Sequence, residues 1–170
     1  ALSSDGATLY AMKTNGFLYA INTSDGSAKW TEPLALTGDG TGSSLSIDGD
    51  GTVYFTTDTR VVAITDNGSD VSIKWSVEAE GASNSGVVIG ADGTLYVGTS
   101  TGLRSLNPSN GSVNWEYAAV INESVPAVDA AGNIYVGTAD GKLLVVNALG
   151  ELLKQFVLTT EVVNSPVIAD

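Results

Sequence analysis

One short pattern recurs four times along the 170 residues at a period of about 42, and this repeat limits the possible folds more than any other feature of the sequence. A turn leads into a segment that contains a tyrosine, and these tyrosines are spaced 44, 42 and 39 residues apart: Tyr10, Tyr54, Tyr96 and Tyr135. A second marker is an aromatic residue near the end of each unit, with spacings of 45, 40 and 41: Trp30, Trp75, Trp115 and Phe156. Two independent markers with one period indicate a repeat architecture.

Each unit contains four short apolar segments, separated by turns rich in Gly, Asp and Asn. Short segments rich in Val, Ile, Leu and Tyr with frequent turn signals are typical of an all-β sandwich, barrel or propeller. The repeat length favours the propeller among these three. We therefore predict an all-β fold, a β-propeller module spanning 1–170 with four four-stranded blades, in repeats of about 5–48, 49–90, 91–129 and 130–170.

Two of the units carry an 11-residue segment with the same internal spacing, residues 20–30 and 105–115. In both, an Asn is followed after four residues by Gly and after four more by Trp. This segment resembles the tryptophan-docking motif of the quinoprotein (PQQ-like) β-propeller repeat family. The second unit has two extra residues in this turn, and the fourth has Phe in place of Trp. The resemblance implies a structural role in docking one blade on the next for Trp30, Trp75, Trp115, Phe156, Gly26 and Gly111. For the three tryptophans, ligand stacking is the alternative interpretation.

The two ends of the sequence are offset by one strand relative to the repeat. Residues 164–170 match the first strand of a unit, and no further unit follows them. Because an unpaired strand edge is a liability, this strand is predicted to complete the blade of residues 7–32, in cis or in trans. Three arrangements remain open: a head-to-tail homodimer that closes an eight-bladed ring, a part of a longer propeller chain, and a four-bladed monomer.

Composition excludes several classes of function. Seven Lys and Arg against 19 Asp and Glu give a net charge of −12, which repels nucleic acid. No apolar run reaches the length of about 18 residues that a membrane-spanning helix needs, so no membrane insertion is expected. The chain has neither Cys nor His, which excludes thiol and imidazole catalysis and most zinc sites.

No cofactor is expected. By resemblance, family enzymes that hold pyrroloquinoline quinone (PQQ) use a calcium ion, an aspartate base and adjacent cysteines, and this sequence has no cysteine pair and no matching cluster. The candidates for a metal site are Asp48 and Asp50. Their segment lacks the third acidic position and the distant Glu of a calcium loop, so a turn is the favoured interpretation and neither calcium nor PQQ is predicted.

The function predicted from these observations is a non-catalytic binding or scaffold module that presents loops and a channel to a protein, peptide or carbohydrate partner. Many proteins with PQQ-like repeats keep the blades without the cofactor, including lipoproteins of outer-membrane protein assembly, and this resemblance favours an extracytoplasmic location. The alternative is a PQQ-dependent or other propeller enzyme (dehydrogenase, glycosidase or lyase), or a fragment of one.

Overall fold

The structure is a computed structural model that describes residues 1–36, 44–82, 85–121, 124–158 and 165–168. Fifteen strands and no helix lie within these ranges, so the described chain contains no helix that could cross a membrane. The strands form four antiparallel sheets in strictly sequential order, which confirms the all-β prediction.

Each sheet is one blade, numbered here in chain order. Blade 1 has three strands: β1 (Thr8–Met12), β2 (Phe17–Asn22) and β3 (Leu34–Ala35). Blade 2 has four: β4 (Ser46–Ile47), β5 (Val53–Thr56), β6 (Arg60–Asp66) and β7 (Val71–Glu78). Blade 3 also has four: β8 (Val87–Ile89), β9 (Leu95–Gly98), β10 (Gly102–Leu106) and β11 (Val113–Ala118). Blade 4 completes the set: β12 (Ala127–Val128), β13 (Ile134–Gly137), β14 (Lys142–Val146) and β15 (Leu152–Val157).

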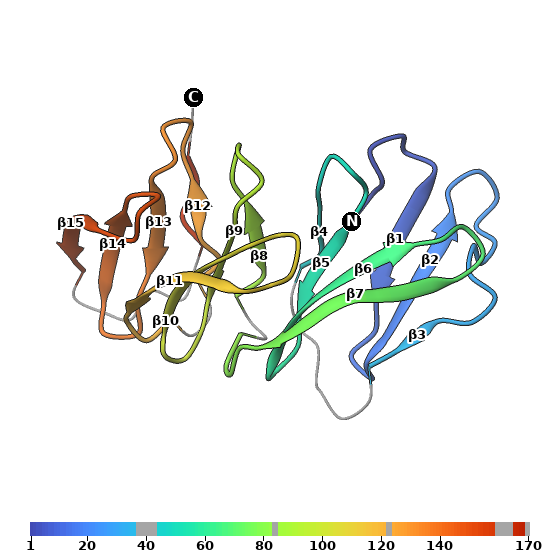
Figure 1. Cartoon of the computed structure of the whole chain (residues 1–170), viewed down its shortest axis with the longest axis horizontal. Coiled ribbons are helices and arrows are strands. Elements are labelled where there is room, and N and C mark those ends of the chain that lie inside the picture. Colours follow the sequence, from blue (N-terminus) through green and yellow to red (C-terminus); the bar gives the residue numbers. More distant parts are fainter. Residues whose placement is uncertain (37–43, 83–84, 122–123, 159–164, 169–170) are drawn as a thin grey trace.

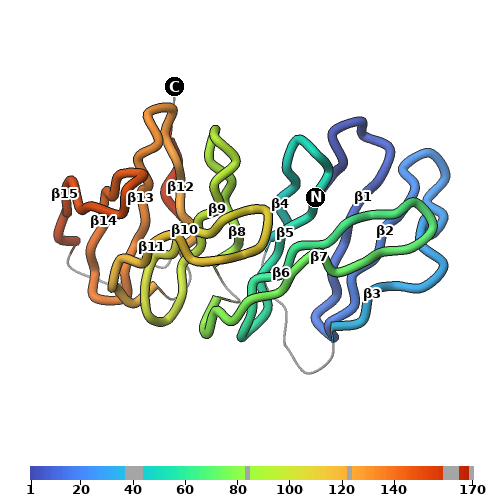
Figure 2. Tube along the Cα trace, viewed as in Figure 1, coloured from blue at the N-terminus to red at the C-terminus, as the bar shows by residue number. Residues whose placement is uncertain are grey.

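The four blades stand side by side in one row, with blade 1 (blue) at one end and blade 4 (orange to red) at the other (Figure 1). Figure 2 follows the chain along this row from blade to blade. Inner strands of neighbouring blades are in contact, as β4 with β8 and β8 with β12. Blades 1 and 4 therefore each have one face without a neighbouring blade among the described residues.

The sheets are offset from the sequence repeats by one strand. Each of blades 2 to 4 takes its first strand (β4, β8 or β12) from the end of the preceding repeat. Among the described residues, blade 1 has three strands instead of the expected four, and a single bridge between Leu2 and Leu9 extends its inner edge.

The segment predicted to complete blade 1 lies only partly within the described residues, because 164, 169 and 170 fall outside them. Residues 165–168 are not in a strand, and the Ser165 hydroxyl accepts a hydrogen bond from the backbone N–H of Val125. This part of the segment therefore lies against blade 4.

The core consists of three apolar clusters that fill the space between adjacent blades. The repeat tyrosines Tyr10, Tyr54 and Tyr96 are each at most 5% exposed. Each of the three contacts the Trp of its own blade, with ring centroids 5.8 to 5.9 Å apart. Burial of such aromatic pairs is a main source of stability, so the markers of the first three repeats lie where blades pack together.

Candidate functional site

The three tryptophans each donate a hydrogen bond to the following blade. The Trp75 Nε1–H donates to the backbone carbonyl of Pro108 over 2.8 Å, and the Trp115 Nε1–H donates to that of Ala148 over the same distance. Trp30 donates instead to the carboxylate of Asp66 over 3.1 Å. In every case the acceptor lies at the end of the third strand of the next blade or within two residues after it. One type of contact therefore recurs between the blades.

At the two joints whose acceptor is a backbone carbonyl, a glycine in the acceptor turn provides the space for the ring. In the turn that receives Trp30, no described atom lies within 4 Å of an added Cβ at Gly68. Gly111 has φ of +74°, and an added Cβ would lie 2.6 Å from a ring carbon of Trp75 and 2.8 Å from Cγ1 of Val77. An added Cβ at Gly150 would lie 2.8 Å from the Trp115 ring. Gly26 has the same conformation, with φ of +73°, but no described atom lies within 4 Å of its added Cβ. The Gly26 turn thus has the conformation of an acceptor turn, and no blade among the described residues covers it.

Phe156 does not occupy the position of the other aromatic residues. In the strand pairing, Trp75 lies opposite Ala63, and Trp115 lies opposite Ser105. The residue of blade 4 at the position of Ala63 and Ser105 is Val145, and it lies opposite Lys154. Phe156 lies two residues further, at the position of Val77 and Tyr117, on the same face of the sheet. The expectation that Phe156 replaces the tryptophan is therefore corrected to Lys154. The signal was available in the sequence, because the residue four after Gly150 is Lys154.

Between blades 1 and 2 the contact is ionic. The Asp66 carboxylate accepts hydrogen bonds from Lys29 Nζ over 2.8 Å, Tyr10 Oη over 2.6 Å and the Trp30 indole. Burial alone would raise the pKa of Asp66, but these donors and the Gly68 amide outweigh it and hold the pKa below its ordinary value. Burial, and then the hydrogen bond to Asp66, raises the pKa of Tyr10. Sequence reasoning missed Asp66, although it lies in the turn that has two extra residues.

The two metal-site candidates lie in the β4–β5 turn. The Asp48 carboxylate accepts from the backbone N–H groups of Asp50 and Thr52 and from Tyr54 Oη, at 2.8 to 3.0 Å, whereas Asp50 is exposed. Burial and this bond to Asp48 raise the pKa of Tyr54 to about 12. Asp129 has the same set of partners in blade 4. Asp48 is therefore engaged by its own turn, and no group of three acidic residues among the described ranges could hold a metal ion.

A groove with a volume of about 380 Å³ lies between blades 3 and 4. Its walls come from the end of β11 and the following residues, from the hairpin of β13 and β14, and from β15: Tyr117, Ala118, Ala119, Val120, Thr138, Ala139, Asp140, Lys142, Leu144 and Gln155. Leu144 is only 2% exposed and lies at its base, while Val120 is 51% exposed at its rim. The ion pair of Asp140 and Lys142 provides the charges of the groove among the described residues.

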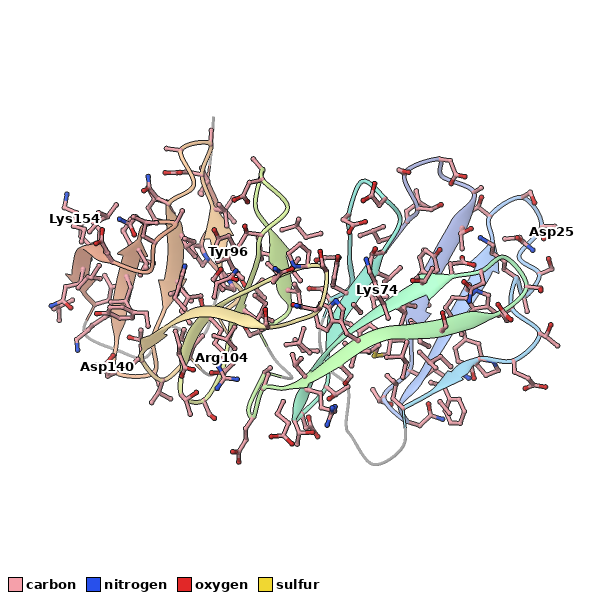
Figure 3. All side chains as sticks on the ribbon, viewed as in Figure 1. Asp25, Lys74, Tyr96, Arg104, Asp140 and Lys154 are labelled. Atoms are coloured by element: carbon pink, nitrogen blue, oxygen red, sulfur yellow. The ribbon has the colours of Figure 1, made fainter. Side chains whose placement is uncertain are left out.

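The residue at the base of the groove differs between the repeats, and in blade 2 Val62 holds this position beside a groove of about 180 Å³. The strand pairings place Arg104 of blade 3 and Leu144 of blade 4 at equivalent positions, opposite Glu116 and Gln155. Arg104 lies against blade 2, where it donates to the Glu78 carbonyl over 3.0 Å. It also pairs with Glu116 of its own blade over 2.9 Å. Leu144 is shorter, and the space beside it stays open. Arg104 and Asp140 lie on the same, lower side of the view (Figure 3).

Comparison with solved structures shows the fold. BamB from Moraxella catarrhalis is 20% identical with a TM-score of 0.69, covering 89% of this chain and 46% of that chain. Virginiamycin B lyase from Staphylococcus aureus is 16% identical with a TM-score of 0.68, covering 94% and 55%, and the C-terminal WD40 domain of Sif2 is 13% identical with a TM-score of 0.75, covering 92% and 45%. The chain thus spans about half the length of these structures.

A search among curated proteins found no match. The family described as "Outer membrane protein assembly factor BamB" matches residues 1–121, which is more than half of the chain and includes blades 1 to 3 in full. The tryptophan contacts, the glycine turns and the β-propeller neighbours all agree with this match. The chain therefore belongs to this family of PQQ-like β-propeller proteins.

Proposed function

We propose that this chain is a non-catalytic scaffold module that binds a protein partner through the groove between blades 3 and 4. The observation that carries the proposal is the open groove itself, with buried Leu144 at its base and the exposed Val120 at its rim. An apolar pocket with a few polar groups at its edge is the usual form of a recognition site. Its position between two blades allows an apolar side chain of a partner to enter while the partner backbone lies along the outer strands.

A protein partner fits the family and the charge of the chain better than the other candidates do. The family description names an assembly factor for outer membrane proteins, which supports both a protein partner and an extracytoplasmic location. The net charge of −12 disfavours nucleic acid. The proposal includes a head-to-tail homodimer. Peptide and carbohydrate ligands are alternative occupants of the same groove.

The proposal includes the absence of catalysis and of a bound cofactor. Two lyases are among the similar structures, but identities of 13% and 16% carry the fold alone. The carboxylates that accept the most hydrogen bonds among the described residues, Asp66 and Asp129, are held by donors from their own blade or the preceding one. An assay of dye-linked alcohol oxidation with added PQQ and calcium is expected to show no turnover, and turnover would contradict this part of the proposal.

The groove can be closed by a substitution that the chain already uses elsewhere. The double variant Leu144→Arg/Gln155→Glu reproduces the Arg104–Glu116 pair of blade 3, so it is expected to fold and to fill the groove. Peptides selected from a random phage-displayed library on the natural protein are expected to bind it by fluorescence anisotropy and to lose at least about tenfold in affinity for the double variant, which corresponds to about 1.4 kcal/mol.

A matched control tests whether the loss comes from the groove. Glu80→Lys changes an exposed charge in blade 2 that does not line this groove, and it is expected to leave the affinity of the selected peptides unchanged. Peptides that bind the natural protein and the double variant equally would place recognition elsewhere and contradict the proposed site.

A further inference from the structure

The two ends of the row present two halves of the contact that joins the blades inside the chain. On blade 1, Tyr10, Leu18, Ala20 and Trp30 belong to the core cluster shared with blade 2. Because side chains alternate along a strand, the opposite face of blade 1 carries the intervening residues. We call this set the Gly26 face: Leu9, Ala11, Tyr19, Ile21 and the turn residues 23–26.

The Gly26 face has the pattern of a face that normally receives another blade. Strand pairing makes Leu9 and Ile21 equivalent to Val53 and Ile64 of blade 2, and Ala11 and Tyr19 equivalent to Phe55 and Val62. In blade 2 these four residues are at most 2% exposed, because blade 1 covers them. In blade 1 Leu9 is 41% exposed. The Gly26 face therefore has the apolar pattern of a docking face, and no blade among the described residues covers it.

Blade 4 presents the opposite half at the other end of the row. We call it the Lys154 face: Tyr135, Leu143, Val145, Lys154 and Phe156, which hold the positions of Tyr54, Val61, Ala63, Trp75 and Val77 in blade 2. Phe156 is 43% exposed, and Lys154 Nζ lies 5.1 Å from the centroid of its ring. A cation held over an aromatic ring in this way forms one compact unit.

The internal contacts show where such a unit would fit. At the Gly111 turn, the atoms nearest to an added Cβ come from Trp75 and Val77, and Lys154 and Phe156 occupy those two positions in blade 4. No described atom lies within 4 Å of an added Cβ at Gly26, as is also the case at Gly68 in the turn that receives Trp30, and the Asp25 carboxylate is exposed beside the Gly26 turn. The Thr23 carbonyl holds the position of Pro108, the acceptor for Trp75. An ammonium group in place of an indole N–H would thus meet a carbonyl and a carboxylate.

Serine contacts next to the inner strands independently indicate that a further strand follows blade 4. Ser85 Oγ donates to the Ser124 carbonyl, and Ser165 Oγ accepts from Val125 N–H. Ser85 and Ser124 each precede the inner strand of a blade, and Ser165 continues their spacing. Residues 165–168 therefore lie where the inner strand of a blade beyond blade 4 would begin. Such a strand is what blade 1 lacks beyond its single bridge at Leu2.

We propose that the Lys154 face of one copy docks on the Gly26 face of a second copy, with Lys154 of the first copy paired to Asp25 of the second and Phe156 against the Gly26 turn. This inference rests on the homodimer in the proposed function and names its contact. Lys154 and Asp25 lie at opposite ends of the row, too far apart to meet within the described blades (Figure 3). Two copies of this chain together are about as long as BamB or the Sif2 domain, of which one copy covers 46% and 45%. Residues 165–168 run beside β1 of the second copy.

A charge exchange tests this contact. In a head-to-tail dimer, Asp25→Lys alone places two lysines at each contact, and Lys154→Asp alone places two aspartates there. Each single variant is therefore expected to be monomeric, and a mixture of the two is expected to form a heterodimer in which both contacts again pair opposite charges. The readout is absolute mass by light scattering coupled to size exclusion at low salt, against the chain mass of 17.3 kDa. Twice this mass is expected for the natural protein and for the mixture, with a decline at high salt because exposed pairs are screened.

Two controls separate this contact from folding and from the proposed function. Asp25→Asn keeps an oxygen that can accept from Ser27 N–H, as Asp25 does, and so removes charge while preserving the turn. It is expected to weaken the dimer. Glu80→Lys, away from both ends, is expected to leave it intact. A natural protein that stays monomeric overturns both the contact and the homodimer. A dimer that persists in both single variants overturns the contact alone, and peptide binding in the groove is unaffected by either outcome.

Discussion

The joint between blades 1 and 2 and the joint between blades 2 and 3 place the same residue type in two different environments. Trp75 donates to a neutral backbone carbonyl beside Gly111, whereas Trp30 donates to a carboxylate that also binds Lys29 and Tyr10. Both indoles are at most 8% exposed. The comparison shows that the repeat conserves the shape of the joint, while its polar partner varies between neutral and charged.

The largest expected effect comes from removing the indole at the neutral joint. Trp75→Ala is expected to lower the free energy of unfolding by about 3 to 5 kcal/mol, because a buried Trp leaves a cavity and loses its hydrogen bond. Urea denaturation followed by circular dichroism measures this. Trp115→Ala, at a joint where the ring is only partly buried, serves as the comparison and is expected to cost less. Equal costs would mean that burial does not set the strength of the joints.

The glycine turns give the next effect. Gly111→Ala is expected to cost about 2 to 4 kcal/mol, since it adds both an unfavourable positive φ and a clash with the Trp75 ring. Gly26→Ala has a similar φ and no atom within 4 Å, so only the backbone cost of about 1 kcal/mol is expected in the monomer. Thermal and chemical unfolding measures the free energy of unfolding of both variants. Equal losses in the two variants would show that the contact of position 111 with Trp75 does not contribute.

The ionic joint is expected to make stability depend on pH. The pKa of Asp66 is lowered in the folded chain, so its contribution is present above its ordinary value of 3.8 and is lost as pH falls through the lower folded value. Asp66→Asn is expected to cost about 1 to 3 kcal/mol at pH 7, because Lys29 and Tyr10 lose their charged acceptor. Denaturation curves from pH 2.5 to 7 should show a smaller acid-dependent loss in the variant than in the natural protein. Parallel pH profiles would contradict the assigned role of Asp66.

The smallest effect is expected at the groove position of blade 3. Arg104→Leu removes a partly exposed ion pair with Glu116, and such pairs contribute only about 0 to 1 kcal/mol. It is expected to open a second groove between blades 2 and 3 with little loss of stability. Xenon binding or a crystal structure of the variant detects the new space, and an unchanged surface would show that side-chain length does not set the groove.

The sequence was sufficient to predict the blades, because two apolar markers with one period report directly on strands and on the core. It did not identify Lys154 as the residue at the fourth docking position. Phe156 was chosen because it is aromatic, although the spacing of four residues after the turn glycine leads from Gly150 to Lys154. Asp66 was missed because its partners Lys29 and Tyr10 come from another blade. The groove was missed because it depends on how blades 3 and 4 pack against each other, which the sequence repeat does not describe.

The central claim is that the outer aromatic of one blade and the glycine turn of the next form a single joint. A double-mutant cycle of Trp75→Ala and Gly111→Ala measures this most directly, with free energies of unfolding for both single variants and the double variant. We expect coupling of about 1 to 3 kcal/mol, because the added methyl group at position 111 no longer meets the ring once Trp75 is removed. Additive costs, within about 0.5 kcal/mol, would show that the two residues act independently and would contradict the claim.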